Sequence, residues 1–521
     1  MQQFIKNHSE NIMGTLSGLD RLRLRGTIRW LATTEGMAKF LGTLGVLLKD
    51  FRSYAQAITH EIRSYTQQLA EDAARPYCYL ASSRTSKEEL AREWAERSRV
   101  REGLICVFRC VEPCWSYQVV RNREKKQLEL RGGPSKCLHL YFYFLDRVLG
   151  LMHLRLQTWF PFTIHLCLNG REWLSRQLDA KGISYVRRAN CLVDVEDFAA
   201  AQRLLDRQLR TDWPKLLDAQ AARCFPLHQK LWGGEPLYYY WSAEESEWAT
   251  DLAFRSSEAL SQLYPQLVRH GIETFSSSDV MRFLGRKTPQ SGKVHGRFLG
   301  EVTSDIRRRP EGLRIKHRLN SNSIKMYDKQ GSVLRVETTI NDARDIKVYR
   351  AAEGDPDGPK AWRRLRKGVS DLHRRSQVSQ AANERYLEAL SAMDDTTPMG
   401  ELAERVTRRL TWQGRPVRGL NPLASQDATL LAAVSRGEFA INGFRNRDLR
   451  AILYPASSPP TERRRQASKI TRQLRMLRAH GLIKKVPKTH RYVLTDRGRT
   501  TITALLTARQ ADTQKLNQLA A

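Results

Sequence analysis

A tyrosine between two lysines lies in the segment NSIKMYDK, in the middle of the chain. Alternation along an extended strand puts Lys325, Tyr327 and Lys329 on one face. In the segment SVLRVETTI, which follows a tight turn, alternation puts Arg335 and Glu337 on one face in the same way. A phenol can act as a nucleophile, cations can hold a phosphate, and a carboxylate can bind a divalent ion. These residue types indicate a site that attacks a phosphodiester, with Tyr327 and Glu337 as catalytic candidates and Lys325, Lys329 and Arg335 as phosphate ligands.

The KMYDK and LRVE pair resembles the strand pair in rolling-circle replication initiators of plasmids and filamentous phages. The resemblance implies strand nicking by Tyr327, with a Mg²⁺ or Mn²⁺ ion at Glu337. The sequence departs from the usual HUH endonuclease pattern, because no His-hydrophobe-His triplet precedes the tyrosine. In the alternative interpretation Tyr327 packs, Arg335 pairs with Glu337 or Asp328, and the lysines contact phosphate without catalysis.

Asp146 is a further candidate catalytic carboxylate, at the end of the predicted strand segment CLHLYFYFLD. The order strand, strand, strand, helix, strand in residues 138–188 is similar to the ribonuclease H-like fold, whose first strand carries a metal-binding carboxylate. Two divalent ions can then clamp the attacking and leaving oxygens, and the partner carboxylates would be among Asp194, Glu196 and Asp197. Asp146 can instead begin a hairpin turn, because DRVLG has Asp at its start and Gly at its end.

Two further groups could bind a metal or a phosphate backbone. The segment HLRLQ places His153, Arg155 and Gln157 on one side of a predicted strand, with His165 on the next strand. That sheet face would be polar and could contact nucleic acid or a metal; in the alternative, these are hydrogen-bonded core residues. The second group consists of Cys106, Cys110, Cys114, Cys137 and His139. It lacks the CxxC spacing of zinc knuckles, so structural thiols are favoured over a metal site.

Residues 425–509 show helical apolar stripes followed by a basic hairpin. The spacing of leucine, isoleucine and valine predicts two short helices at the start of this segment. A third helix, from about Thr461 to His480, keeps Ile470, Leu474 and Leu477 on one face and is basic around the rest. The glycine that follows ends it. The segment LIKKVPKTHRYVLTDRGR predicts two short strands around a basic tip.

This order resembles the MarR-like branch of winged-helix DNA-binding domains. The resemblance implies that the third helix lies in the major groove and that the hairpin contacts flanking phosphates. In the alternative, the same fold packs against protein or binds RNA. The candidate nucleic-acid ligands of this segment are Arg463, Arg464, Arg465, Lys469, Arg472, Arg475, Lys484, Lys485, Lys488 and Arg491.

Composition favours a polyanionic partner. The 521 residues include 87 Lys and Arg against 55 Asp and Glu, for a formal net charge of +32. No secretory signal or apolar run of membrane-spanning length is visible. Eight Cys are too few for a disulfide scaffold in a chain of this length. A cytoplasmic protein with no membrane partner is therefore expected. No Walker A, Rossmann, HExxH or GxSxG motif is present, and no nucleotide or organic cofactor is expected.

The chain is predicted to be α+β, with a helical N-terminal region, central and mainly antiparallel α/β sheet domains, and a C-terminal winged helix-turn-helix. LDRLRLRGTIRWL is among the helices expected near the N-terminus, and a helix pair is expected after the aromatic run that ends at Trp241. The expected segments are a helical basic region (1–102), an α/β domain (103–230), helices with a β-hairpin (231–350), a basic helical segment and linker (351–424), and the winged helix (425–521).

Three functions are compatible with these features. The leading one is a DNA-processing factor of a mobile element, similar to a replication initiator, that finds a site through the winged helix and holds or nicks a strand. A non-enzymatic MarR-like regulator would bind a duplex without cleavage, but such regulators are short. A ribonucleoprotein component would use the same cations on RNA, because phosphate contacts are alike in DNA and RNA.

Overall fold

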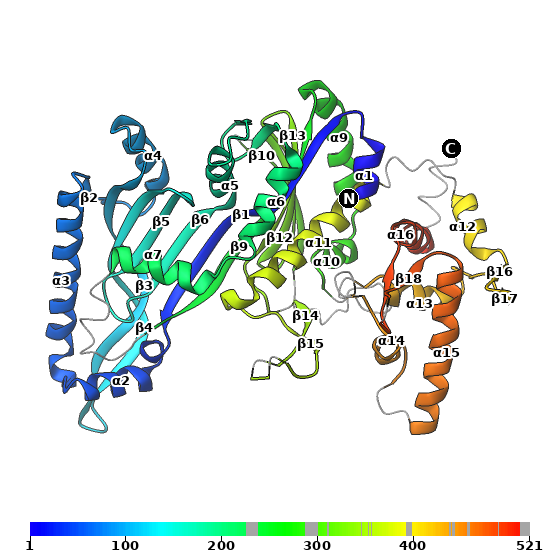
Figure 1. Ribbon diagram of the computed structural model, residues 1–521. Coiled ribbons are helices and arrows are strands. Elements are labelled where there is room, and N and C mark those ends of the chain that lie inside the picture. Colours follow the sequence, from blue (N-terminus) through cyan, green and yellow to red (C-terminus); the bar gives the residue numbers. More distant parts are fainter. Residues whose placement is uncertain are drawn as a thin grey trace. The chain divides into compact units, whose positions relative to one another are not determined.

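The computed structural model describes residues 1–521 except 226–237, 287–300, 310–311, 345, 353, 356, 392–398, 437–438, 440–442, 456–458, 488 and 511–521. The chain forms two compact units, each assembled from separate stretches of sequence. Unit 1 consists of Met1–Thr15, Ala249–Leu365 and Gln377–Ala521, and unit 2 consists of Leu16–Trp248 and Arg366–Ser376. Helices and strands are present in both units, so the predicted mixed α+β class is confirmed (Figure 1).

Unit 2 is organised around an antiparallel sheet. β1 pairs with β6, β6 with β5, β5 with β4 and β4 with β3, and the short β2 joins β3 in parallel. β1 begins and β9 ends with residues of unit 1, and the earlier part of β9 is the neighbour of β1. The strands are β1 (Ile12–Ile28), β2 (Tyr77–Tyr79), β3 (Gly103–Asn122), β4 (Gln127–Asp146), β5 (Gly150–Gln157), β6 (Ile164–Asn169), β7 (Tyr185–Arg187), β8 (Leu192–Val195) and β9 (Tyr239–Phe254).

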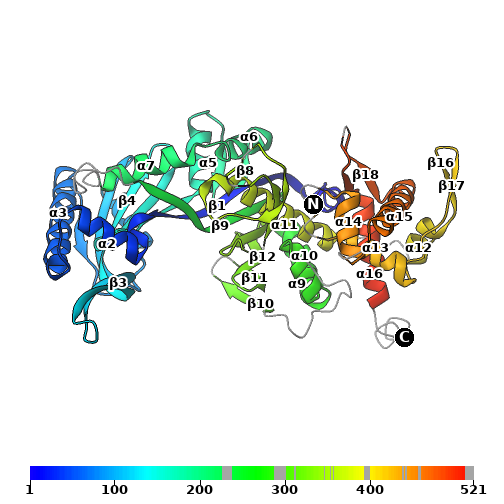
Figure 2. The same cartoon turned by 90° about the horizontal axis from the view of Figure 1, so that it is seen from below.

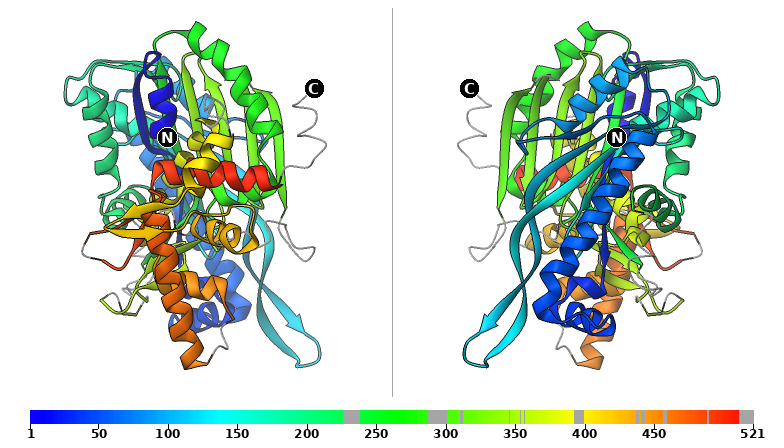
Figure 3. Two further views of the ribbon diagram at one scale, coloured as in Figure 1. Left: turned by 90° about the vertical axis from the view of Figure 1, so that its right-hand side faces the viewer. Right: turned by 90° about the vertical axis from the view of Figure 1, so that its left-hand side faces the viewer.

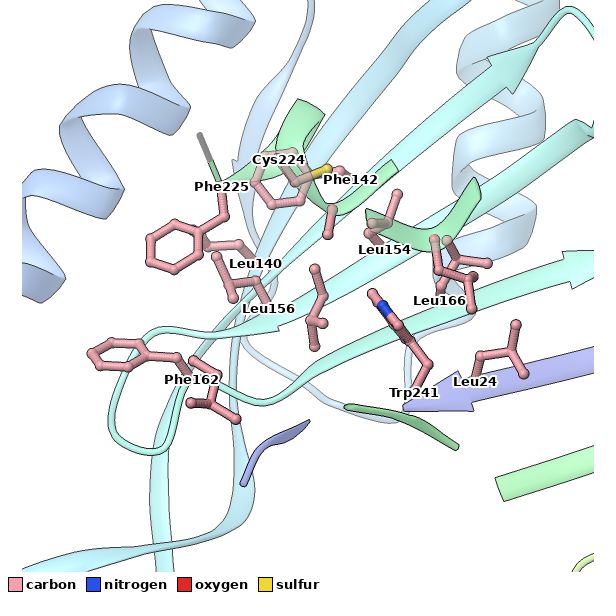
Figure 4. Packing of buried hydrophobic residues seen from close by; sticks show 14 of the residues in the cluster. Leu24, Leu140, Phe142, Leu154, Leu156, Phe162, Leu166, Cys224, Phe225 and Trp241 are labelled. Atoms are coloured by element: carbon pink, nitrogen blue, oxygen red, sulfur yellow. The ribbon is translucent and has the colours of Figure 1, made fainter. Parts of the chain in front are cut away.

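Helices cover one apolar face of this sheet. Figure 4 shows Leu154, Leu156 and Leu166 of that face beside Cys224 and Phe225 from the end of α7. The same cluster includes residues of α2 and α3. The helices of unit 2 are α2 (Thr34–Thr43), α3 (Phe51–Asp72), α4 (Lys87–Arg97), α5 (Gly170–Asp179), α6 (Phe198–Gln208) and α7 (Trp213–Cys224).

β3 and β4 form a long hairpin. They pair continuously from Gly103–Leu145 to Asn122–Gln127, with one irregularity between Leu104 and Cys106. The distal end of the hairpin extends away from the rest of unit 2 (Figures 2 and 3, cyan). The segments WSYQVV and KQLELR are parts of these two long strands.

In unit 1 the strands β10, β11, β12, β13 and the last part of β9 are neighbours in this order, and β10 to β13 pair antiparallel. Leucine, isoleucine and methionine side chains of one face pack with α9, α10 and α11 in a single cluster (Figure 1). The elements are α1 (Gln2–Asn7), α9 (Ser257–Glu273), α10 (Ser277–Phe283), β10 (Val302–Arg309), β11 (Gly312–Leu319), β12 (Asn322–Lys329), β13 (Val333–Ile340), β14 (Lys347–Arg350), β15 (Ala361–Arg364) and α11 (Leu372–Ser391).

The C-terminal part of unit 1 has a core of its own. Ile470, Leu474 and Leu477 of α15 are buried in it, as their spacing predicted. Gly481 follows α15 with φ +71°, a left-handed conformation that glycine adopts without strain. The elements are α12 (Met399–Thr407), β16 (Leu410–Trp412), β17 (Arg415–Val417), α13 (Ser425–Val434), α14 (Asn446–Leu453), α15 (Pro460–Ala479), β18 (Ile483–Lys485), β19 (Tyr492–Leu494) and α16 (Asp496–Gln510).

Two segments expected as helices are strands. LDRLRLRGTI lies in β1, where Leu22 and Leu24 are buried while Arg21 and Arg23 are exposed. This period of two is the strand pattern, and the prediction was wrong because leucine and arginine also favour helices. SAEESEWATDLAF, expected to begin a helix pair, lies in β9, and α9 is a single helix. No helix among the described residues is long and apolar enough to cross a membrane.

Side-chain caps begin several helices. Ser86 accepts a hydrogen bond from the backbone of Glu89 at the start of α4, and Asn169 caps α5. Ser276 and Asp279 form a reciprocal capping box at the start of α10.

Candidate functional site

The hairpin of β12 and β13 brings the predicted central residues together. Lys325 lies opposite Glu337, and Tyr327 lies opposite Arg335. All four are on one sheet face, because residues two apart along a strand point the same way. The Lys329 ammonium lies 5.7 Å from the centre of the Tyr327 ring. The prediction that Lys325, Tyr327 and Lys329 share one face of β12, and that Arg335 and Glu337 share one face of β13, is therefore confirmed.

Glu337 is the centre of this group. Its Oε1 atom lies 2.5 Å from Lys325 Nζ, and the Tyr327 hydroxyl donates a 2.7 Å hydrogen bond to Oε2. The side chain is only 3% exposed. Burial would raise the pKa of Glu337, but the charges of Lys325 and Arg335 outweigh it and lower the pKa to about 2. Glu337 is thus ionised at neutral pH and holds the phenol in a fixed orientation.

Arg335 pairs with Asp251 of β9. Its Nε and Nη2 atoms lie 2.5 and 2.8 Å from the two carboxylate oxygens, and both side chains are buried. This two-pronged geometry is the strong form of the arginine–carboxylate bond. From the sequence, Glu337 or Asp328 is the expected partner of Arg335; Asp251 is its two-pronged partner, and the charge of Arg335 also acts on Glu337. Sequence reasoning missed Asp251 because its segment was interpreted as helical.

A larger set of cations surrounds this group on the same face. Arg314 of β11 lies opposite Tyr327, Lys316 lies opposite Lys325, and β10 adds arginines at its outer edge. Sequence reasoning did not select the cations of β10 and β11, although Arg314, Lys316 and Arg318 alternate visibly in GLRIKHRL. We call this surface the basic sheet face; it comprises Arg307, Arg309, Arg314, Lys316, Arg318, Lys325, Lys329 and Arg335, with the carboxylates Asp251, Asp305 and Glu337.

Charge on the basic sheet face is not balanced. Lys316 and Arg314 have no hydrogen-bond or ion-pair partner for their side chains among the described residues. Burial and then the neighbouring cations Lys325, Arg318 and Arg314 lower the pKa of Lys316 to about 8, and Asp305 only partly opposes them. Crowded cations with too few counter-charges are electrostatically unfavourable unless an anion joins them. The arrangement therefore favours binding of a polyanion.

Exposure falls from the edge of this face inward. The side chains of Arg307 and Arg318 are 53% and 40% exposed, whereas those of Lys325 and Glu337 are 12% and 3% exposed. The outer strands can thus contact a polymer directly. The inner strands hold the hydrogen-bonded group around Tyr327.

Asp146 lies in unit 2, where its side chain stabilises a turn. Its Oδ1 atom accepts hydrogen bonds from the backbone of Val148 and Leu149 at 2.9 and 3.0 Å, and Arg223 donates to Oδ2 at 2.9 Å. The turn interpretation is therefore confirmed, and a catalytic role for Asp146 stays a prediction. β7, the last strand of the expected ribonuclease H-like order, pairs only with β8, outside the large sheet.

The expected carboxylate partners of Asp146 also make local contacts. Asp194 accepts from the backbone of the next residue, Glu196 accepts from Ser184, and Asp197 caps α6. Each oxygen of Glu337 already interacts with a neighbour, Oε1 with Lys325 and Oε2 with Tyr327, and a divalent ion at Glu337 stays a prediction. We therefore assign no chemical step to Mg²⁺ or Mn²⁺.

The cysteine and histidine group lies on the β3–β4 hairpin. The Sγ atoms of Cys114 and Cys137 are 3.4 Å apart, and Cys137 Sγ lies 4.0 Å from His139 Nδ1. Cys106 and Cys110 are buried in an apolar cluster under α4. Burial raises the pKa of Cys106 to about 12, as expected for a packed structural thiol.

Cations of α15 lie on the side away from its buried stripe. Arg463, Arg464, Arg465, Lys469 and Arg472 are exposed, and Arg475 is half-buried. In the following hairpin Lys484 and Lys485 are exposed, Arg491 lies over the Tyr349 ring at 4.1 Å, and Lys488 lies outside the described residues. α15 is thus amphipathic, with one face in the core and the other a dense array of positive charge.

Comparison with family models, with curated proteins and with solved structures finds no match to this chain.

Proposed function

We propose that this chain is a nucleic-acid-binding protein that holds a single strand on the basic sheet face and binds duplex DNA through α15 and the β18–β19 hairpin. The observation that carries the proposal is the pair Arg314 and Lys316, two neighbouring cations on one face of β11 that form no ion pair with the described residues. A phosphate backbone supplies a row of anions at the spacing of such cations, and its binding releases condensed counterions. The formal net charge of +32 acts in the same direction.

The C-terminal elements support the duplex part of the proposal. The order α13, α14, α15, hairpin and α16 is the order of a winged helix-turn-helix. Asn446 of α14 donates to the Ala467 carbonyl of α15 at 2.8 Å, which fixes these two helices against each other. In such a fold the third helix enters the major groove and the hairpin lies on the backbone. The exposed arginines and lysines of α15 fit that role.

Two α15 variants test duplex binding. Replacing Arg464 and Lys469 by Ala removes two exposed cations and leaves the buried stripe intact. Affinity for duplex DNA should fall about tenfold at moderate salt, because two phosphate contacts are lost. Affinity for a single strand should change little. Fluorescence anisotropy with labelled oligonucleotides measures both values.

The matched control is the double replacement of Arg52 and Arg63 by Ala on α3. Both residues are exposed cations of another helix, so the net charge falls by the same amount. Equal losses in the two double variants would show that only total charge matters and would contradict the role of α15. Tighter binding of an RNA strand than of either DNA form would move the proposal to an RNA partner.

A second, narrower proposal concerns Tyr327, which the hydrogen bond to Glu337 favours. The phenol oxygen would attack the phosphorus of the held strand, the phenol proton would pass to solvent, and the sugar oxygen would leave as a hydroxyl after taking a proton from solvent. Lys316 and Lys325 are placed to stabilise the charge that develops on the phosphoryl oxygens. With its pKa at about 2, Glu337 orients the phenol more than it deprotonates it.

The Tyr327→Phe variant tests this chemistry. Full-length protein is incubated with labelled single strands and a divalent salt, and protein-linked label is detected on a denaturing gel. We expect a covalent adduct with the wild type and none with Tyr327→Phe, while strand affinity stays within about twofold because the ring is retained. An adduct of equal yield in both proteins would exclude Tyr327 as the nucleophile.

A further inference from the structure

Unit 1 contains a cavity of about 510 Å³ that the proposed nucleic-acid surfaces do not use. Residues of α9, α10, α11, α13 and α16 line it. Its apolar wall includes Phe275, Phe439, Phe444, Leu402 and Val434. Cavities of this volume with aromatic walls suit small organic molecules. No residue of the basic sheet face and no cation of α15 is part of the lining, so a separate ligand is implied.

Arg385 of α11 is a buried cation at this cavity. The residue is 8% exposed, and its Nε and Nη2 atoms both donate to the backbone carbonyl of Phe283. The remaining Nη1 atom is buried and has no hydrogen-bond acceptor in the described part of the chain. A buried guanidinium with an unused donor and no carboxylate partner is costly, so such a group marks a place where an acceptor binds.

The lining also includes Arg282, Arg436 and Arg499. Arg282 donates to Asp279 at 3.0 Å, so its charge is balanced. Arg499 of α16 is half-buried and makes no side-chain hydrogen bond or ion pair with the described residues. Burial and then the charges of Arg499 and Arg282 lower the pKa of Arg385 to about 9, and Glu384 only partly opposes them. The cavity therefore holds more positive than negative charge at this end.

Glu388, the other carboxylate of the lining, does not neutralise Arg385 or Arg499. Glu388 accepts from the N-terminal ammonium of Met1 at 2.8 Å and from the Thr500 hydroxyl at 3.3 Å. Its charge is therefore already used within unit 1. Arg385 and Arg499 are left as two cations beside an aromatic wall.

We propose that this cavity is a binding site for a small organic anion, whose acidic group is held by Arg385 and Arg499 and whose apolar body packs against the phenylalanines. The ligand class is an aromatic or aliphatic carboxylate, sulfonate or phosphate. Guanidinium groups bind such planar or tetrahedral anions with several donors at once. The cavity volume excludes a nucleic-acid strand, so this site goes beyond the proposed function.

Isothermal titration of the full-length protein with three probes tests the site. 1-Naphthoate has both the acidic group and the aromatic body, 1-naphthamide has the body without charge, and acetate has the charge without the body. We expect saturable binding of 1-naphthoate with one site per chain, at least tenfold weaker binding of the amide, and no measurable binding of acetate. Equal binding of amide and naphthoate would overturn the proposal, as would absence of saturable naphthoate binding.

A matched pair of variants on α16 locates the site. Arg499→Ala should weaken naphthoate binding about tenfold or more, because one charged donor is lost. Arg497→Ala removes the same charge two residues earlier, from an exposed position outside the cavity, and should leave binding unchanged. Arg499 makes no described bond that folding depends on, so both variants should unfold at the wild-type temperature. Equal weakening in the two variants would show adventitious binding to surface charge and contradict the site.

Discussion

The two units each present a polar sheet face, and the two faces differ in charge balance. In unit 2, Arg23 and Arg25 of β1 both lie 3.4 Å from Glu244, while Arg21 lies 3.8 Å from Glu245. In unit 1, the cations of the basic sheet face outnumber its carboxylates, and two of them have no partner among the described residues. The same alternation of residues along strands thus builds a self-neutralised face in one unit and a cationic face in the other.

Histidine does not alter this contrast near neutral pH. Burial, followed by the charge of Arg21, lowers the pKa of His153 to about 3. Burial also lowers the pKa of His165, although Glu244 partly opposes it. Gln157 donates to the backbone carbonyls of Trp115 and Phe160. Arg155 pairs with Glu112 at 2.9 Å. The polar residues predicted on this face of unit 2 therefore act as hydrogen-bonded or ion-paired structural groups, and the two histidines add no positive charge near neutral pH.

Removing the carboxylate partner of Arg335 on the basic sheet face should have the largest effect on stability. Asp251→Ala leaves Arg335 buried without its carboxylate, and the free energy of unfolding should fall by about 3–5 kcal/mol. Urea denaturation measures the change. The double variant Asp251→Leu with Arg335→Met removes both charges and should recover most of the loss. A single variant within about 1 kcal/mol of the wild type would contradict the structural role of this pair.

Lowering the pH should reduce the stability that the group around Glu337 contributes. The pKa of Glu337 is about 2 in the fold against an ordinary value of 4.5, so its stabilising contribution is present above pH 4.5 and is lost as pH falls toward 2. The contribution corresponds to roughly 3 kcal/mol at neutral pH. Unfolding measured from pH 6 downward should therefore decline more steeply for the wild type than for Glu337→Gln. Parallel curves would show that Glu337 is not held ionised by Lys325 and Arg335.

The sequence predicts the central hairpin well because its information is local. A tight turn and strict alternation fix which side chains of β12 and β13 share a face, and the register confirms them. The partner of Arg335 is not local: Asp251 comes from a strand whose position follows from tertiary pairing. The same holds for the cavity, where Arg385 and Arg499 come from distant helices.

β1 shows a different limit of sequence reasoning. Leu22 and Leu24 alternate with arginines at a period of two, which is a strand pattern, yet leucine and arginine are strong helix formers. Pairing with β6 makes this segment a strand. The alternation in β11 could likewise have revealed Arg314 and Lys316, which the account now places at the centre of strand binding.

The salt dependence of single-strand binding tests the central claim most directly. Affinity of full-length protein for a labelled single strand is measured by anisotropy over a series of salt concentrations, for Arg314→Ala with Lys316→Ala and for Arg23→Ala with Arg25→Ala. Each lost phosphate contact reduces the slope of log affinity against log salt by about 0.7. We predict a reduction of about 1.4 for the first pair and no change for the second, whose charges are paired with Glu244 and Glu245. Equal slopes in both variants would contradict the assignment of the basic sheet face as the strand-binding surface.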